Sequence, residues 1–263
     1  MGIGDNIMAT GLAKGARARG KRIAFGDGNK IRWDSNSSQI FFGNPNIAPP
    51  GHEHHKDLEW VRYYKGEPNS RIYNEQRGNR WVWHPERFKA IPGEIFLTPK
   101  EIAWAELHGK GFIVIEPNVP NNKSCAPNKQ WPIDRFNDVA RMLKSDGHEV
   151  VQFIYPAAKY RLQDAKVIAT PTFRHAVAVL KNAKLAILPE GGLHHAAAAV
   201  GTKAVVLFGG FIPPSVTGYD KHVNLTGGAE ACGSHTRCDH CVKAMDAITV
   251  NEVYGAAKGL LDG

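Results

Sequence analysis

The residues best suited to chemistry surround two glycines, Gly191 and Gly192, which follow Glu190. An apolar run over residues 185–188 precedes them, an alanine-rich segment follows, and a second apolar run covers 204–208. This order predicts a strand, a helix and a parallel strand. The helix then begins at the carboxyl edge of the sheet, where unpaired backbone N–H groups and the helix dipole attract phosphate. We therefore expect a diphosphate-binding site at this helix start.

A second candidate site lies at the amino terminus, where Gly2 and Gly4 precede Asp5. The small residues here predict a glycine loop over residues 1–11, ahead of a helix that ends near Arg19. Such a loop allows the backbone to approach a ligand closely. Asp5 is suited to act as a general base or, more simply, to cap the helix. A flexible terminus is the remaining interpretation of this stretch.

Three cysteines near the carboxyl terminus, Cys232, Cys238 and Cys241, are of a residue type that binds zinc. His235 lies within the same segment and is the candidate fourth ligand. Only one pair, Cys238 and Cys241, has the short spacing typical of structural zinc, so free thiols are the favoured interpretation. We therefore assign no metal to the protein and keep zinc at these four residues as the alternative.

Beyond residue 110 the sequence alternates apolar strands with helices. This alternation predicts an α/β fold with a parallel, doubly wound sheet, whose buried strands read as continuous apolar runs. The expected strands cover residues 112–115, 149–155, 166–169, 185–188 and 204–208, and the expected helices cover 133–145, 173–181 and 250–261, with the alanine-rich helix between the last two strands.

The first part of the chain is less regular. Thr98 and Pro99 have the residue types of an N-cap and a first helical residue, so a short helix is expected after them. Glycines follow this helix and indicate a domain boundary, which divides the chain into domains 1–109 and 110–263. Upstream of the helix, short strands are expected over 23–25 and 58–64.

The composition predicts a folded protein with an acidic partner. Hydrophobic residues make up 43% of the 263 residues, which is ordinary for a soluble globular protein. The net charge of +8 and the pI near 9.3 favour nucleotide phosphates, anionic lipids or nucleic acid as partners. The sequence has no signal-peptide pattern and no apolar run of the roughly 18 residues that cross a bilayer, so we expect a cytoplasmic protein without a transmembrane segment.

Three segments of the sequence resemble glycosyltransferase family 9, the heptosyltransferase-like enzymes. The first is the Gly-Asp stretch around Asp5. The second is Glu116-Pro-Asn, followed by Lys129-Gln-Trp-Pro at the start of a helix. The third is Glu190-Gly-Gly-Leu-His-His, followed by the alanine-rich helix and by Phe-Gly at 208–209. The three occur in the order of the family and together span most of the chain.

The resemblance implies a GT-B fold, in which two Rossmann-like domains face a cleft, here with a reduced N-terminal domain. It allows the final helix to pack back on that domain. The implied activity is an inverting transfer of a sugar from a nucleotide-diphosphate sugar to an acceptor hydroxyl, with no required metal or other cofactor. The C-terminal domain would hold this donor. The N-terminal domain would hold a glycan or lipid-linked acceptor, such as lipopolysaccharide or another cell-surface glycan.

The family motifs also imply roles for single residues. Asp5 matches the base that takes the proton of the acceptor hydroxyl. Lys129 matches the lysine that stabilises the departing diphosphate, although by itself it reads as a surface lysine ahead of a helix. The implied donor-binding residues are Glu190, Gly191, Gly192, Leu193, His194, His195 and Gly209, and the implied acceptor-side residues are Gly4, Asn6 and Thr10.

Departures from the family leave the two substrates open. Glu190 and Gly191 stand where the family has aspartate and threonine, which changes the contacts to the donor and leaves its base and sugar undetermined. The short N-terminal half favours a different or more open acceptor, and together with the positive charge it makes modified DNA the alternative to a glycan. A nucleotide-sugar epimerase and a non-catalytic nucleic-acid-binding protein are the other alternative functions.

Overall fold

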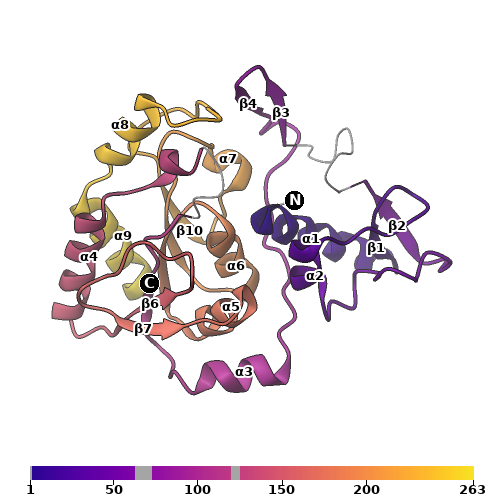
Figure 1. Cartoon of the computed structure of the whole chain (residues 1–263), viewed down its shortest axis with the longest axis horizontal. Helices are drawn as coiled ribbons and strands as arrows, with labels where there is room; N and C mark the ends of the chain where they lie inside the picture. Colours follow the sequence, from indigo (N-terminus) through magenta and orange to yellow (C-terminus); the bar gives the residue numbers. More distant parts are fainter. Residues whose placement is uncertain (1, 63–72, 120–124) are drawn as a thin grey trace.

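The computed structural model describes residues 2–62, 73–119 and 125–263, and its largest element is a parallel β-sheet (Figure 1). Within the described residues, six strands lie in the order β10-β9-β8-β5-β6-β7, and every neighbouring pair is parallel. The predicted α/β fold is thus confirmed. The strands are β5 (Ile113–Ile115), β6 (Val150–Ile154), β7 (Lys166–Ala169), β8 (Leu185–Pro189), β9 (Ala204–Leu207) and β10 (His222–Leu225).

Helices cover both faces of this sheet. They are α4 (Ile133–Ser145), α5 (Phe173–Asn182), α6 (Gly192–Val200) and α9 (Val250–Asp262). The short helix α7 (Pro214–Thr217) follows β9, and α8 (Asp239–Ala247) packs on the 3-10 helix η1 (Ala126–Lys129). Successive residues of a strand point to opposite faces. Ile113 and Ile115 of β5 therefore pack in a core with α4 and α9, whereas Val114 packs in a core with α5 and α6.

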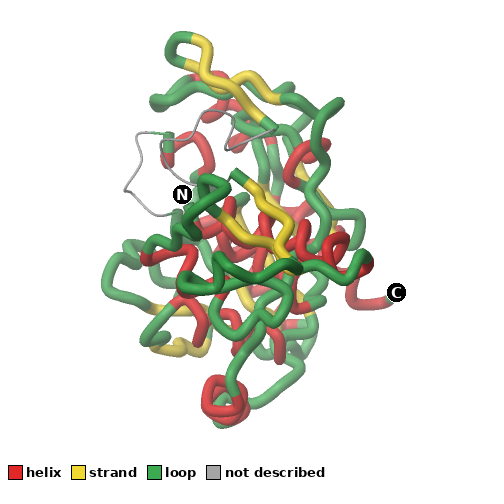
Figure 2. The backbone as a smooth tube through the Cα atoms, turned by 90° about the vertical axis from the view of Figure 1, so that its right-hand side faces the viewer, coloured by secondary structure: helices red, strands yellow, loops and turns green. Residues whose placement is uncertain are grey.

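The N-terminal part is a small α/β unit, at the right of Figure 1. Its strands β1 (Arg22–Phe25) and β2 (Leu58–Val61) pair in parallel, beside helices α1 (Ile3–Ala18) and α2 (Ser35–Phe41). The hairpin of β3 (Asn74–Arg77) and β4 (Arg80–Trp83) and the helix α3 (Pro99–Glu106) lie at opposite ends of the molecule, at the top and bottom of Figures 1 and 2. This small unit agrees with the reduced N-terminal domain that was expected.

The two parts of the chain are in close contact. Helix α1 packs on α6, and α3 packs on α5. The guanidinium of Arg174 on α5 donates to both carboxylate oxygens of Glu101, at 2.6 and 2.8 Å, and both side chains are largely buried. The hairpin also docks on the C-terminal part, because the backbone N–H of Trp81 donates to the carbonyl of Gly233 at 2.8 Å. The exact domain boundary near residue 109 stays a prediction.

Two expectations about the ends of the chain are wrong. The expected loop is absent from the described residues of this stretch, since α1 begins at Ile3 and residues 3–11 are helical. Its glycines lower the intrinsic helix propensity, but packing against α6 supplies the stability that propensity lacks. The final helix α9 packs on α4, β8 and β9 and thus stays with the C-terminal part. Its buried residues Val253 and Ala257 belong to the same core as α4.

The remaining elements were predicted unevenly. Thr98 accepts a hydrogen bond from the N–H of Glu101, so it caps α3 as expected. The predicted strand over 58–64 is present as β2, while its residues 63 and 64 lie outside the described residues. Elements α2, β3, β4, β10 and α8 were not predicted. Among the residues that the structure describes, none of the helices is both long and apolar enough to span a bilayer.

Candidate active site

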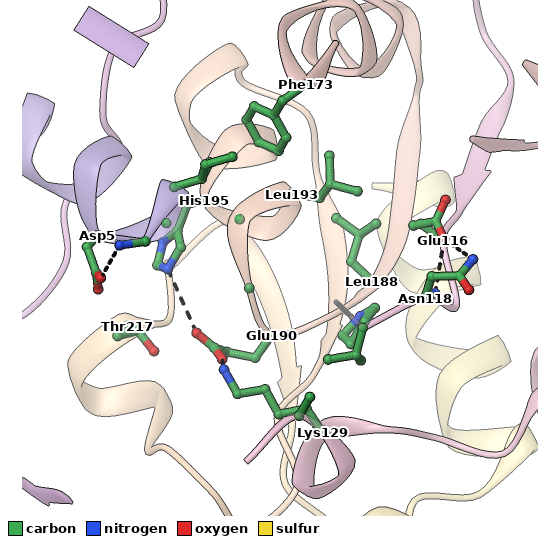
Figure 3. A pocket seen from close by; sticks show the side chains of 18 of the residues that line it. Asp5, Glu116, Asn118, Lys129, Phe173, Leu188, Glu190, Leu193, His195 and Thr217 are labelled. Carbon is green, nitrogen blue, oxygen red and sulfur yellow. Dashed lines mark hydrogen bonds and ion pairs between the residues drawn. The ribbon is translucent and has the colours of Figure 1, made fainter. Parts of the chain in front are cut away.

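A cavity of about 700 Å³ lies along the carboxyl edge of the six-stranded sheet (Figure 3). Its wall combines the ends of β5, β6, β7 and β8 with the first turns of α1, α5 and α6. A cavity of this volume is typical of small-molecule sites. Its place beyond the carboxyl ends of parallel strands is where open α/β sheets bind their ligands.

The start of α6 presents an open backbone to this cavity. Gly191 is the N-cap residue, and a Cβ added there would meet no atom within 4 Å. Gly192 and Leu193 follow as the first two helical residues, whose N–H groups have no partner inside a helix. All three line the cavity. Together they form an approachable site for an anion.

Lys129 and Glu190 form a buried ion pair beside this helix start. The Lys129 ammonium donates to Oε2 of Glu190, whose side chain is only 5% exposed. Burial by itself raises the pKa of Glu190, but the charge of Lys129 and its hydrogen bond to the carboxylate outweigh burial and hold that pKa below its ordinary value. The side chain of Asn128 anchors the turn that carries Lys129 through hydrogen bonds to the backbone of residues 234–238.

Asp5 faces the same cavity from the first turn of α1. Its Oδ2 accepts a hydrogen bond from the N–H of Gly2 at 2.9 Å, and its Oδ1 accepts one from the hydroxyl of Tyr73. Asp5 thus caps α1 as well as lining the cavity. A Cβ added to Gly4 would lie 2.7 Å from Cδ2 of His195, so α1 packs directly against α6. This packing brings Asp5 and the start of α6 into one site.

His194 and His195 are both buried, with ring centroids 3.9 Å apart, but only His195 lines the cavity. The ring of His195 bonds through Nδ1 to the hydroxyl of Tyr219 at 2.7 Å. The ring of His194 accepts from the N–H of Gly191 at 3.0 Å and contacts the carbonyl of Thr217 at 2.9 Å. His194 therefore supports the turn from behind. Burial is the main cause that lowers the pKa of both rings, so both are neutral at pH 7.

These two histidines and Glu190 place possible metal ligands within 4.8 Å of one another. Their atoms are already engaged, however. Glu190 is paired with Lys129, and both ring nitrogens of His194 contact backbone groups. The cluster therefore fits a hydrogen-bonded support for the α6 turn better than a metal site.

Four predicted binding residues do not line the cavity: Asn6, Thr10, His194 and Gly209. Asn6 and Thr10 are buried on α1, where Asn6 bonds to the carbonyl of Gly2 and the Thr10 hydroxyl bonds to the carbonyl of Ile7. Gly209 has a φ of +57° and packs against Met245. The physical reason for the error on α1 is that a helix turns only one face to the cavity, whereas the expected loop presented all its residues.

The cysteine loop brings three sulfur atoms together. Those of Cys232, Cys238 and Cys241 lie within 4.8 Å of one another, with Cys232 Sγ 3.2 Å from Cys241 Sγ. His235 is not a member of this group, and its ring packs against Trp81 with centroids 4.7 Å apart. The structure therefore unites three of the four candidate zinc ligands and separates the fourth, and zinc stays the alternative to the predicted free thiols.

Several residues of the cavity wall have no role predicted from the sequence. Glu116, at the end of β5, is buried there, and its burial raises its pKa to about 7. The available signal was a glutamate directly after an apolar strand. Tyr73, Trp81 and Trp83 line the cavity near the hairpin. Nothing in the sequence linked Tyr73 to Asp5.

Solved glycosyltransferases share this fold. The family 9 glycosyl transferase from Veillonella parvula DSM 2008 is 16% identical over 98% of this chain and 79% of its own, with a TM-score of 0.51. The iron-containing dodecameric glycosyltransferase TibC from enterotoxigenic E. coli H10407 is 16% identical over 85% of this chain and 67% of its own, with a TM-score of 0.56. At such identities the likeness concerns the fold alone, and it confirms the expected GT-B type.

A third similar structure is the E. coli ADP-heptose LPS heptosyltransferase II, which is 20% identical over 64% of this chain, with a TM-score of 0.48. The present chain spans only 53% of that protein. No curated protein matches the sequence. The model of glycosyltransferase family 9 (heptosyltransferase) matches residues 98–249, more than half of the chain, and this range includes Lys129 and the start of α6. The chain therefore belongs to glycosyltransferase family 9.

Proposed function

We propose that the protein transfers a sugar from a nucleotide-diphosphate sugar to an acceptor hydroxyl, with inversion at the transferred carbon. The observation that carries this proposal is that the Asp5 carboxylate and the open start of α6 face one cavity. Membership in family 9 supports it. TibC, which shares the fold, has been solved in complex with ADP-D-β-D-heptose, which supports a nucleotide-sugar as the donor here.

The donor diphosphate would lie at the start of α6. The N–H groups of Gly192 and Leu193 point out of the first turn, and the helix dipole adds partial positive charge. Lys129 would turn from Glu190 toward the phosphates or share its protons between them. Negative charge grows on the diphosphate as the sugar leaves, so these fixed donors stabilise the transition state more than the ground state.

Asp5 would accept the proton of the attacking hydroxyl. Inversion requires attack from the side opposite the departing diphosphate, so the base has to face the diphosphate site across the cavity. In Figure 3, Asp5 lies across the cavity from Lys129 and Glu190, beyond His195. The hydrogen bonds from Gly2 and Tyr73 would orient its carboxylate for this role.

No metal is needed in this scheme, because Lys129 and the helix start supply the positive charge. We expect the transfer rate to stay the same after treatment with EDTA. A rate that falls with EDTA and returns with one added metal would refute metal independence.

The proposed acceptor is a lipopolysaccharide or another cell-surface glycan, reached in the cytoplasm before export. The heptosyltransferase description of the family supports it. The aromatic walls formed by Tyr73, Trp81 and Trp83 would hold an extended acceptor beside Asp5. The net charge of +8 favours modified DNA as the second candidate. DNA affinity that falls steeply between 50 and 200 mM salt, together with transfer to DNA, would decide for that candidate.

The test begins with a thermal-shift screen of nucleotides and nucleotide-sugars, because a ligand of the native state raises its melting temperature. The best donor is then incubated with glycan and DNA acceptors, and the anomeric configuration of the product is assigned by NMR. We expect inversion. Retention would refute the mechanism, and turnover of donor without an acceptor would favour an epimerase.

A further inference from the structure

A buried carboxylate with an unused oxygen lies in the cavity at a distance from the proposed chemistry. Glu116 is 1% exposed and belongs to the cavity wall. Its Oε1 accepts two hydrogen bonds from Asn118, at 3.0 Å from the backbone N–H and 2.7 Å from the side-chain amide. Its Oε2 has no hydrogen-bond partner among the described residues, and the backbone of Phe153 is only the weakest of the causes that act on the pKa of this carboxyl. Buried polar atoms are nearly always bonded, so an orphaned carboxylate oxygen indicates a missing partner.

The carboxylate is held in place by a preorganised network. The side-chain oxygen of Asn118 accepts from the N–H groups of Lys159 and Tyr160, at 2.8 and 2.7 Å, and its amide donates to the carbonyl of Tyr160 at 3.0 Å. Asn118 thereby connects the end of β5 to the loop after β6. Because Asn118 also fixes Oε1 of Glu116, the orientation of Oε2 is set before any ligand binds.

The order of the strands shows which part of a ligand would reach Glu116. Strand β8 leads into the start of α6, β5 is its neighbour, and β6 and β7 follow. Neighbouring strands lie about 4.8 Å apart, so Glu116 lies about one strand away from the diphosphate site. In a nucleoside diphosphate the ribose follows the diphosphate, and the base follows the ribose. The base would then lie beside Tyr155, which lines the cavity at the end of β6.

The picture of the cavity agrees with this order. In Figure 3, Asp5 lies on one side of Glu190 and Lys129, and Glu116 with Asn118 lies on the other side, beyond Leu188. Carboxylates at strand ends of Rossmann-type sheets accept hydrogen bonds from ribose hydroxyls. The hydroxyl has a donor hydrogen and the orphaned Oε2 has free lone pairs, so the two are complementary.

We propose that Oε2 of Glu116 accepts a hydrogen bond from a ribose hydroxyl of the donor nucleotide and so selects ribonucleotides over deoxyribonucleotides. This inference rests on the proposed function, since it takes a nucleoside diphosphate as the ligand. The raised pKa of Glu116 agrees with a carboxylate that burial has left without enough donors.

The experiment measures dissociation constants by calorimetry at pH 8 for ADP, GDP, UDP and CDP and for their 2′-deoxy and 3′-deoxy counterparts. The wild-type protein is expected to bind its best ribonucleotide about 10- to 100-fold more tightly than one of the two deoxy forms, as for a hydrogen bond to a charged group. The variant Glu116→Ala should bind the ribonucleotide at most about 3-fold more tightly than the deoxy form, and Glu116→Gln should show a preference between those of the wild type and Glu116→Ala. The control is Glu149→Gln, which removes a half-exposed carboxylate at the opposite end of β6.

The outcomes separate this inference from the proposed function. A ribose preference that disappears in Glu116→Ala and persists in Glu149→Gln supports it. Tight binding of a ribonucleoside diphosphate without any ribose preference, or with a preference that survives Glu116→Ala, overturns the role of Glu116 and leaves the proposed function intact. If none of the four nucleoside diphosphates binds the wild-type protein, both are overturned.

Discussion

Replacing Glu116 with glutamine is expected to stabilise the protein above pH 7 and to change its stability little near pH 5. Burial is the main cause that raises the pKa of Glu116 from 4.5 to about 7, against smaller opposing contributions from Asn118 and from the backbone of Phe153. Between pH 4.5 and about pH 7, the folded state holds more protons at Glu116 than the unfolded state does. The free energy of unfolding therefore falls as the pH rises through this window. Above the window, the destabilisation caused by the buried charge of Glu116 is complete.

The raised pKa sets the size of the effect. At about 1.36 kcal/mol per pKa unit, the penalty from Glu116 reaches about 3 kcal/mol above pH 7. Roughly 2.5 kcal/mol of it develops between pH 5 and pH 8. Glutamine keeps an oxygen that can accept from Asn118, but it carries no charge that needs to be desolvated. The stability of Glu116→Gln relative to wild type should therefore rise by about 2.5 kcal/mol over this range.

The assay is urea unfolding of both proteins, without nucleotide, at several pH values from 5 to 8 and followed by the fluorescence of the six tryptophans. Burial lowers the pKa of His194 and His195, and it lowers the pKa of His222 to about 4. These three histidines therefore reduce the free energy of unfolding as the pH falls. Both proteins share this contribution, and it cancels in their difference. A difference that is constant with pH, or that shrinks toward pH 8, would refute the reasoning. Glu149→Gln should show no such trend.

Three further predictions concern the proposed active site. Asp5→Asn should lower the transfer rate by about 100- to 10,000-fold and leave the dissociation constant of the donor within about 2-fold of the wild-type value. The control is Asp134→Asn, which changes an exposed aspartate in the first turn of α4 and should alter neither quantity. A transfer rate of Asp5→Asn equal to that of the wild type would exclude Asp5 as the base. Lys129→Ala leaves the buried Glu190 carboxylate unpaired and should lower the free energy of unfolding by about 3–5 kcal/mol, as well as weakening donor binding. The double variant with Glu190→Gln should recover stability but not binding, and a single variant as stable as wild type would contradict the buried pair. Gly4→Ala places a methyl group 2.7 Å from the ring of His195 and should impair transfer. The control is Gly15→Ala in the same helix, whose methyl group meets no atom closer than 3.5 Å and should stabilise the protein by about 0.5–1 kcal/mol. Equal transfer rates and equal stabilities of the two variants would disprove the tight packing of α1 on α6.

The sequence by itself determined the C-terminal sheet and the turn at which we propose that the donor binds. Strands buried on both faces read as apolar runs, so β5, β6, β8 and β9 were predicted to within a residue or two at each end. Amphipathic spacing gave α4 with its observed bounds, because its buried residues repeat at helical intervals. Glycines after a strand indicated the open turn at the start of α6, where we propose anion binding, since this signal is local to the turn.

Only the tertiary structure decided how the N-terminal part completes the site. Helix α1 begins at Ile3 because it packs on α6, and local propensity does not contain that contact. The partners of Asp5 and Lys129 are Tyr73 and Glu190, which are 68 and 61 residues away in the chain. The raised pKa of Glu116 likewise comes from burial between elements that the sequence keeps apart. Residue types set which chemistry is available to this chain, and long-range packing decides which of those residues meet, because desolvation and pairing depend on neighbours in space.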